Sequence, residues 1–258
     1  MIFDFADRVA IVTGAAHGFG RAISRHLAQQ GASVWACDIL DEELRETQQL
    51  CERQGGRCVS RRVDVTREDE VSAFVAEVMA AAGRVDILVN NAGGVVGQVG
   101  RPIETVSAEE WTKVVAINLT ASFLCIRAVA PAMKQQRYGR IVNISSGAGR
   151  SVSLTGIQAY ASAKAGQIGL TRQMAYELGP WGITVNNVAP GFVLSNPASE
   201  RQWESYGKQR QQEIVHGLAL QRLGAADDIA HGVLFFASDY AAWCTGQVIS
   251  IDGGSDLF

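Results

Sequence analysis

The chain has 258 residues, of which 47% are hydrophobic and 19% charged, as expected for a globular protein with a large buried core. The net charge is −3 without any basic block, which argues against a nucleic-acid partner or an anionic membrane. The N-terminal residues, MIFDFADR, lack the long apolar run of a signal peptide. Five cysteines without a C-x-x-C pair indicate reduced buried thiols, no metal site and a cytoplasmic location.

The first 38 residues predict a nucleotide-binding βαβ unit. A β-branched run at 8–13 predicts a strand, a helix is expected over 21–30, and a second strand over 33–37 ends at Asp38. The intervening turn has the spacing G-x-x-x-G-x-G, not the commoner G-x-G-x-x-G. Glycine suits it because a diphosphate must approach the N–H groups of a helix start without a Cβ in the way. The expected cofactor contacts are Gly14, His17, Gly18, Phe19 and Gly20.

Asp38 indicates which dinucleotide this unit takes. A carboxylate at the end of the second strand can accept hydrogen bonds from the adenosine ribose and would repel a 2′-phosphate. His17 and Ile39 stand where a 2′-phosphate pocket would need Arg or Lys. The sequence therefore predicts NAD, with NADP less favoured, and Asp38 and Ile39 as cofactor contacts.

Strands and helices alternate to the end of the chain. Further helices are expected over 40–54, 66–82, 107–136, 158–178 and 226–238, and strands over 57–64, 85–89, 140–145, 183–189 and 247–251. Thr66 with Asp69 and Ser107 with Glu110 are expected to cap two of the helices. Six or seven strands alternating with helices, without a linker or repeat, predict one α/β domain over 1–258 with a doubly wound parallel sheet and helices on both faces.

The most apolar segment, 114–133, is predicted to be a buried helix and not a membrane span. Asn118, Thr120, Ser122 and Arg127 interrupt its apolar residues. A buried amide needs hydrogen-bond partners, so we expect Asn118 either to hold a water or to break the helical hydrogen-bond ladder.

Tyr160 and Lys164 stand four residues apart in the helix expected over 158–178. Positions i and i+4 share one helix face, so both side chains can enter one pocket. A phenol ordinarily loses its proton near about pH 10, and an adjacent ammonium lowers that pKa because it favours the phenolate. Such a pair could transfer protons near neutral pH, although the same spacing is common on an ordinary amphipathic helix.

Motifs along nearly the whole chain resemble those of the short-chain dehydrogenase/reductase family. In chain order they are Thr13-Gly14-x-x-x-Gly18-x-Gly20, Asp64-Val65, Asn90-Asn91-Ala92-Gly93, Asn118, Ser146, Tyr160-x-x-x-Lys164 and Pro190-Gly191. The resemblance implies a Rossmann fold and an oxidoreductase that interconverts a secondary alcohol and a ketone with a nicotinamide cofactor. It also implies a homotetramer in which the helices with Asn118 and Tyr160 pair between subunits, and in which the tail 253–258 could approach a neighbouring site.

The resemblance gives four residues catalytic roles. Ser146 would hydrogen-bond the reacting oxygen, and Tyr160 would exchange a proton with it. Lys164 would lower the Tyr160 pKa and hold the nicotinamide ribose, while Asn118 would anchor a water linked to Lys164. Ser146 lies 14 residues before Tyr160, one more than the family pattern, so the loop between them should bulge, and Ser145 is the competing serine. The further cofactor contacts implied are Asp64, Val65, Asn91, Ala92, Gly93, Pro190, Gly191, Val193 and Ser195, the last in place of the family's usual threonine.

The substrate class stays open. Arg150 and Gln158, between the catalytic serine and tyrosine, and Arg101 in the preceding loop suggest a sugar, a polyol or a keto-acid whose carboxylate meets Arg150. The polar stretch 194–215 resembles a mobile lid over the site. Its aromatic residues could instead form, with Phe192, a pocket for an apolar or cyclic ketone or a 3-oxoacyl group. The full set expected near the substrate is Gly94, Ser146, Arg150, Gln158, Phe192, Trp203 and Tyr206.

Two other classes of function are less favoured. A hydrolase with a Ser-His-Asp triad would need a G-x-S-x-G elbow, which the sequence lacks, and its four histidines do not follow the predicted catalytic strands. A non-catalytic dinucleotide sensor could share the fold, but it would not need Ser146, Tyr160 and Lys164 together.

Overall fold

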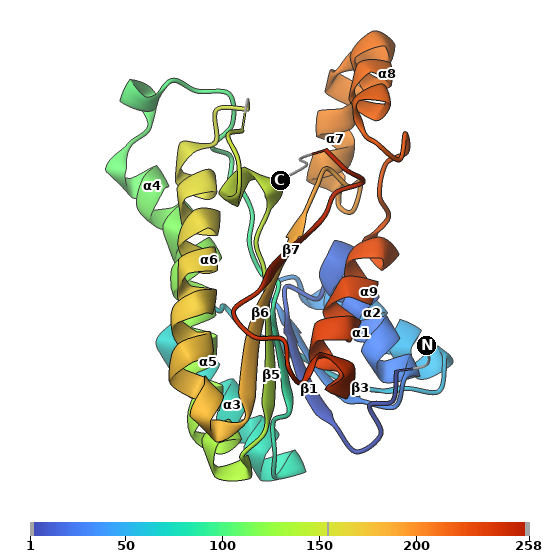
Figure 1. The fold of residues 1–258 in the computed structure, drawn as a ribbon, viewed down its shortest axis with the longest axis vertical. Helices are drawn as coiled ribbons and strands as arrows, with labels where there is room; N and C mark the ends of the chain where they lie inside the picture. Colours follow the sequence, from blue (N-terminus) through green and yellow to red (C-terminus); the bar gives the residue numbers. More distant parts are fainter. Residues whose placement is uncertain (1–2, 154, 256–258) are drawn as a thin grey trace.

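Seven parallel strands form the middle layer of the molecule (Figure 1). The computed structural model describes residues 3–153 and 155–255. The strands lie in the order β3-β2-β1-β4-β5-β6-β7, so the winding direction reverses between β1 and β4. Ligands of such sheets bind at the carboxyl ends of the strands beside this reversal. The strands are β1 (Val9–Thr13), β2 (Ser33–Asp38), β3 (Arg57–Arg62), β4 (Ile87–Asn90), β5 (Gly139–Ile144), β6 (Ile183–Pro190) and β7 (Val248–Ile251).

Helices cover both faces of this sheet (Figure 1). One face carries α1 (Gly18–Gln29), α2 (Asp41–Arg53) and α9 (Ala226–Ala237), and the other carries α3 (Glu68–Ala82), α5 (Ala121–Gln136) and α6 (Gln158–Leu178). The alternation of side chains along β1 shows why both faces are apolar, because Ala10 and Val12 enter one core cluster while Val9 and Ile11 enter the other. The predicted doubly wound α/β fold is therefore confirmed.

The capping predictions have opposite outcomes. Ser107 and Glu110 form the expected capping box at the start of α4 (Ala108–Val115), with Glu110 N–H 3.1 Å from the Ser107 hydroxyl. The prediction that Thr66 caps α3 is wrong. The Thr66 hydroxyl donates to the Asp64 carboxylate at 2.7 Å, and α3 begins only at Glu68, without a side-chain cap.

The helix expected over 107–136 is divided in two. A π-helical turn, Ala116–Thr120, separates α4 from α5, and Asn118 lies fully buried within it. The Asn118 Nδ2 donates to the Val114 carbonyl at 2.8 Å, so the amide interrupts the helical ladder as one of the two alternatives predicted. Within the described part of the chain, Ala108–Gln136 is the one stretch with the length and hydropathy of a membrane span, and its buried residues pack into the core as those of a core helix do.

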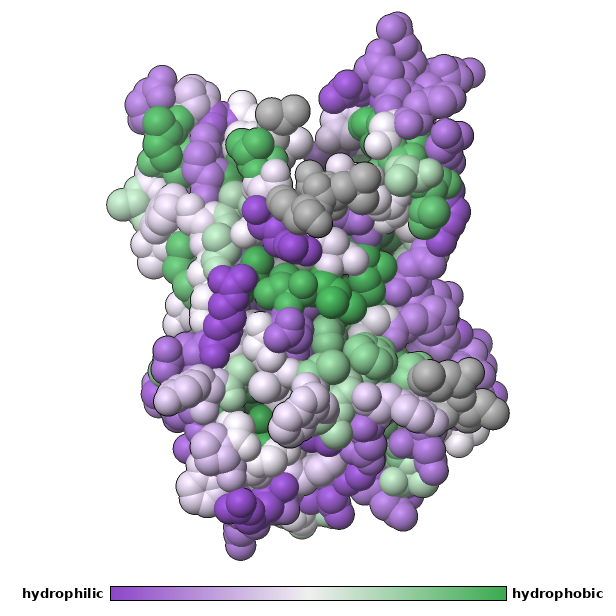
Figure 2. Space-filling view, viewed as in Figure 1, coloured by the Kyte–Doolittle hydropathy of each residue, from purple (hydrophilic) through white to green (hydrophobic). Residues whose placement is uncertain are grey.

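The stretch predicted as an irregular lid is helical. It forms α7 (Pro197–Ser205) and α8 (Gly207–Gly217), which project beyond the carboxyl ends of the strands (Figure 1). The surface of α8 is hydrophilic, and the molecule is notched between this hairpin and the opposite projection at the end of α4 and α6 (Figure 2). Of the tail predicted to reach a neighbouring subunit, residues 256–258 lie outside the described residues.

Candidate active site

A cavity of about 390 Å³ opens at the carboxyl ends of the strands, beside the reversal between β1 and β4. Most residues predicted to contact a cofactor line it, namely Gly14, His17, Gly18, Phe19, Asp38, Ile39, Asp64, Val65, Asn91, Ala92, Gly93, Tyr160, Lys164 and Ser195. Six lining residues are not marked by the motifs, namely Leu40, Val63, Ile117, Ile144, Ser145 and Asn196. Five of these, all except Ile144, directly adjoin a predicted residue in the chain. Ser145 was the competing serine, and for the other four the only signal was their position beside a predicted residue.

The glycines of the turn before α1 are needed for their lack of a side chain. Gly14 and Gly18 have φ angles of 65° and 57°, which favour glycine. A Cβ on Gly14 would lie 2.7 Å from the Ala92 Cα, and one on Gly18 would lie 2.6 Å from the Ser195 carbonyl oxygen. Gly20 does not line the cavity, and its Cβ would lie 2.1 Å from the Gly14 oxygen, so it allows α1 to pack closely on the turn.

Asp38 is held in place by backbone N–H groups. One carboxylate oxygen accepts from Ala16 N–H at 3.0 Å, and the other accepts from the N–H groups of Ile39 and Leu40 at 2.7 and 3.1 Å. The carboxylate thus stays at the mouth of the glycine-rich turn, where Ile39 and Leu40 are its exposed neighbours.

Thr47 and Arg21 support the same turn from behind, and no motif indicates either residue. The Thr47 hydroxyl, on α2, donates to the Ala15 carbonyl at 2.8 Å. The Arg21 Nε donates to the Ala16 carbonyl at 2.9 Å, and its Nη2 pairs with Glu46 at 3.0 Å. The Arg21 charge is therefore engaged away from Asp38.

Ser146, at the end of β5, is the serine that meets Tyr160. A side-chain interaction with Ser146 acts to lower the pKa of Tyr160, whereas the Ser145 hydroxyl is buried and donates to the Asn187 side chain. The expected bulge after Ser146 is a short 3₁₀ turn, Gly147–Gly149. A Cβ on Gly149 would lie 2.7 Å from the Lys164 carbonyl carbon, so this glycine lets the turn pack against α6.

Burial dominates the titration of both Tyr160 and Lys164. The Lys164 Nζ donates to the Ile144 carbonyl at 2.7 Å and lies 5.6 Å from the centre of the Tyr160 ring. Burial lowers the pKa of Lys164 to about 7. Burial raises the pKa of Tyr160, and the hydrogen bond with Ser146 opposes this only in part. Burial thus disfavours the charged forms of both residues, and the lowering of the Tyr160 pKa by Lys164 with a bound nicotinamide stays a prediction.

Asn118 fixes the loop that follows β4. Its Nδ2 donates to the Gly94 carbonyl at 2.7 Å, and its Oδ1 accepts from the Gly94 N–H at 3.0 Å. A Cβ on Gly93 would lie 2.5 Å from this Oδ1 and 3.1 Å from the Lys164 Nζ. The loop, Asn118 and Lys164 are therefore in direct contact, and Gly93 cannot carry a side chain without displacing them.

Asn91 ties the end of β4 to the glycine-rich turn. Its Nδ2 donates to the carbonyl groups of Thr13 and Gly14 at 3.0 and 2.9 Å. Three other residues predicted to contact the cofactor, Pro190, Gly191 and Val193, do not line the cavity. Val193 instead forms a β-bridge with Gly224, which closes the base of the lid.

Of the residues expected near the substrate, Gly94 lines the cavity. The others do not line it, namely Ser146, Arg150, Gln158, Phe192, Trp203 and Tyr206. Arg150 donates to the Ser250 hydroxyl at 2.6 Å, and Arg101 pairs with Glu110. Phe192, Trp203 and Tyr206 form an aromatic cluster, with ring centres 5.8 to 6.4 Å apart, that packs the lid helix α7 against the end of β6.

A doubly wound sheet with a tyrosine, lysine and serine at its carboxyl edge defines a class of dinucleotide-dependent enzymes. A family model described as enoyl-(acyl carrier protein) reductase matches residues 14–256. The chain is 38% identical over 252 residues, or 98% of each chain, to BbsD of Thauera aromatica, a subunit of a hydroxy(phenyl)methylsuccinyl-CoA dehydrogenase. It is also 38% identical over 247 residues to the 3-oxoacyl-(acyl-carrier-protein) reductase FabG of Thermotoga maritima, which covers 96% of this chain and 97% of the relative.

The solved structure of levodione reductase superposes with a TM-score of 0.91 at 34% identity and covers 97% of this chain and 98% of the other. The chain therefore belongs to the short-chain dehydrogenase/reductase family. It is an oxidoreductase that acts on alcohol or keto groups, with a nicotinamide dinucleotide as the family's cofactor.

Proposed function

We propose that this enzyme interconverts a secondary alcohol and an apolar or cyclic ketone with NAD(H), and that Tyr160 is its general acid and base. The observation that carries the proposal is the side-chain interaction of Ser146 with Tyr160, which lines the cavity together with the buried Lys164. A tyrosine whose proton is shared with a serine hydroxyl is placed to exchange it with a substrate oxygen.

The residues that line the cavity are of the kinds that a dinucleotide would need. The N–H groups at the start of α1 would hold the diphosphate, since no side chain caps this helix and its first turn has no acidic residue. Asp38 would hold the adenosine ribose, Asp64 and Val65 would flank the adenine, and Asn91 to Gly93 and Ser195 would line the nicotinamide half. The bound nicotinamide supplies or accepts the hydride.

The neighbours of Asp38 support NAD over NADP. The cavity wall next to Asp38 is formed by Ile39 and Leu40, which carry no charge. The nearest turn arginine, Arg21, is engaged with Glu46 and with backbone carbonyls. A 2′-phosphate at this place would meet the Asp38 carboxylate, and the two cavity-wall residues that follow Asp38 offer it no positive charge.

The protein's own residues provide the proton transfer. The Ser146 hydroxyl would hydrogen-bond the substrate oxygen and hold it within reach of the Tyr160 hydroxyl. With a pKa of about 7, the Lys164 Nζ can hold or release a proton near neutral pH. The Gly93–Gly94 loop, clamped by Asn118, keeps Lys164 in place during this exchange.

The residues around the opening of the cavity favour an apolar substrate over a sugar or a keto-acid. The two arginines considered for a carboxylate are engaged with Ser250 and Glu110, respectively. Val96 and Val152 are 57% and 82% exposed on the loops that flank the cavity, and aromatic rings pack the lid. The name of the relative BbsD contains a phenyl group beside the hydroxyl, which supports an apolar group next to the reacting carbon, and a succinyl-CoA part, which is charged.

We also infer a cytoplasmic homotetramer. Large apolar side chains are exposed on the α4–α6 side and near β7, which suits contacts between copies, among them Trp111, Phe123, Tyr176, Tyr240 and Trp243. Sedimentation of the purified protein as a monomer would overturn this inference.

Replacing Tyr160 by Phe tests the mechanism. A side-by-side assay of apolar and cyclic ketones, 3-oxoacyl thioesters, polyols and sugar acids, with NAD(H) and with NADP(H), first identifies a substrate. Tyr160→Phe is then expected to lower kcat by at least about 100-fold, because the proton donor is lost. Tyr176→Phe is the matched control, since it removes the hydroxyl of a tyrosine on the same helix that does not line the cavity, and it keeps the apolar ring. Unchanged turnover by Tyr160→Phe would contradict the mechanism, and turnover of polyols alone would contradict the substrate class.

A further inference from the structure

Gln98 is a buried amide in the loop after β4, and no motif marks it. Its side chain is 1% exposed. The Gln98 Nε2 donates to the Gln158 Oε1 at 2.7 Å, and its Oε1 accepts from the Ala159 N–H at 3.3 Å. Both partners belong to the first turn of α6, which is 60 residues further along the chain.

The start of α6 lacks a cap of its own. The residue before the helix is Ile157, whose side chain cannot accept a hydrogen bond. The first N–H groups of a helix have no partner within it, and an Asp, Asn, Ser or Thr side chain usually accepts from the second or third of them. Ala159 is the second residue of α6, so the Gln98 Oε1 occupies the place of that missing cap.

The same contact joins two loops beside the cavity. The Gln158 Nε2 donates to the Arg101 carbonyl at 2.7 Å, and the Gly100 N–H donates to the Thr155 carbonyl at 2.8 Å. The loop 94–101 is thereby fastened both to the loop before α6 and to the first turn of the helix. That loop begins at Gly94, which lines the cavity and is clamped by Asn118.

Tyr160 is the third residue of α6, directly after Ala159. We propose that Gln98 is a positioning residue that caps α6 from a distant loop and thereby holds the Tyr160 hydroxyl against Ser146. The effect on turnover rests on the proposed function, whereas the cap itself does not. Because the cap comes from the loop beside the substrate, the position of this loop and the position of Tyr160 are coupled.

Hydrogen exchange and kinetics of Gln98→Met test this role. Methionine has a similar length but cannot accept from the Ala159 N–H. We expect amide exchange in the segment 157–164 of the cofactor-free protein to accelerate by about tenfold, as for a lost helix cap. We expect kcat to fall by about tenfold or more, because Tyr160 loses its alignment. The Kd for NADH should change by less than about twofold, because the contacts proposed for the cofactor do not involve Gln98.

Gln158→Met is the matched comparison. It removes the tie to the Arg101 carbonyl and the acceptor of the Gln98 Nε2, but the Gln98 Oε1 can still accept from the Ala159 N–H. Exchange should therefore accelerate in the segment 94–101 and less in 157–164 than it does in Gln98→Met. Gln49→Met, on the exposed face of α2, controls for the substitution itself.

Three results would overturn the proposal. The first is amide exchange in 157–164 of Gln98→Met that stays within twofold of the wild-type rate. The second is an equal acceleration of exchange in 157–164 in Gln98→Met and Gln158→Met. The third is a loss of NADH affinity in Gln98→Met as large as its loss of kcat. If the wild type turned over no alcohol or ketone, the proposed function would fail, while the exchange measurement would still decide whether Gln98 caps the helix.

Discussion

Burial of the Lys164 ammonium at the site lowers the stability of the folded protein. The pKa of Lys164 falls from an ordinary 10.5 to about 7 because the ammonium is buried. Between pH 7 and 10.5 the Lys164 amine is protonated in the unfolded chain and neutral in the folded chain, so the free energy of unfolding rises with pH. The penalty is therefore fully present below about pH 7 and fades as the pH approaches 10.5.

Lys164→Met should remove this pH dependence. We expect the free energy of unfolding of the wild type, relative to the variant, to rise by roughly 2–3 kcal/mol between pH 7 and 9. Urea unfolding of both proteins at each pH measures it. Buried thiols such as Cys125, whose pKa burial raises to about 12, titrate in both proteins and cancel in the difference. A difference that stayed flat across this pH range would show that Lys164 is charged in the folded protein.

Ile39, beside Asp38, is the position at which one substitution should shift the preference between NAD and NADP. It is exposed beside Asp38 in the cavity wall, so a longer residue can be placed there without disturbing the core. We expect Ile39→Arg to raise kcat/KM for NADP by about tenfold, since a guanidinium can pair with the 2′-phosphate. Ile39→Gln supplies length without charge and should leave the ratio of NAD to NADP nearly unchanged. A wild-type enzyme that already prefers NADP would contradict the proposed role of Asp38.

At the scale of elements, local sequence determined most strands and helices. Apolar runs ending in Gly, Asp or Asn placed the carboxyl ends of the strands, and the sheet then brought the predicted residues to one edge. The start of α3 was misplaced because the Thr66 hydroxyl can bond either to the first turn of the helix or to the Asp64 carboxylate, and in the structure it bonds to Asp64. The α7–α8 hairpin was missed because aromatic packing on Phe192 stabilises it, not a regular apolar period. Gln98 was missed because its partners are about 60 residues away.

The α7–α8 hairpin depends on Trp203. Its ring lies 5.8 Å from Phe192 and 6.4 Å from Tyr206. Aromatic pairs contribute about 0.5–1.5 kcal/mol each, so Trp203→Ala should loosen the lid and raise KM for an apolar ketone by about tenfold. Steady-state kinetics measure KM, and titration with NADH should show an unchanged Kd. Arg210→Ala, which breaks only an exposed pair with Glu213, is the control, and an equal KM in both variants would mean that the lid does not bind substrate.

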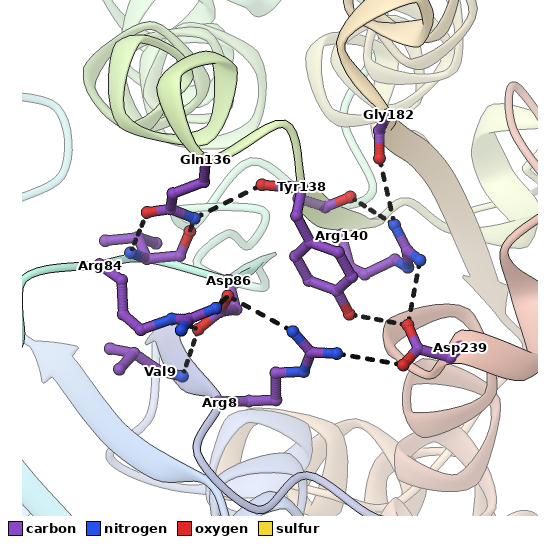
Figure 3. A network of polar contacts seen from close by, with 11 residues as sticks. Arg8, Val9, Arg84, Asp86, Gln136, Tyr138, Arg140, Gly182 and Asp239 are labelled. Carbon is purple, nitrogen blue, oxygen red and sulfur yellow. Dashed lines mark hydrogen bonds and ion pairs between the residues drawn. The ribbon is translucent and has the colours of Figure 1, made fainter.

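At the scale of the whole molecule, a charged network joins the end of the sheet opposite the cavity (Figure 3). Asp86, at the start of β4, is fully buried and accepts from the Val9 N–H at 2.9 Å and from the Arg84 Nε at 2.8 Å. Arg8 lies between Asp86 and Asp239, at 3.8 and 3.1 Å. The network therefore connects the strands β1 and β4 with the segment that follows α9.

Asp86 should stabilise this end of the molecule far more than Asp239 does. Removing one partner of a buried ion pair leaves the other charges and the Val9 N–H without their acceptor, so Asp86→Ala should lower the free energy of unfolding by about 3 kcal/mol or more. Asp239 is 63% exposed but pairs with the buried Arg140 as well as with Arg8, so solvent offsets only part of its loss and Asp239→Ala should lower the free energy of unfolding by clearly less than Asp86→Ala does. Urea unfolding measures both values. Because the cavity lies at the other end of the strands, kcat of the folded Asp86→Ala protein should stay within about twofold of wild type. Equal losses of stability in the two variants would show that the buried Asp86 contributes no more to stability than the exposed Asp239 does.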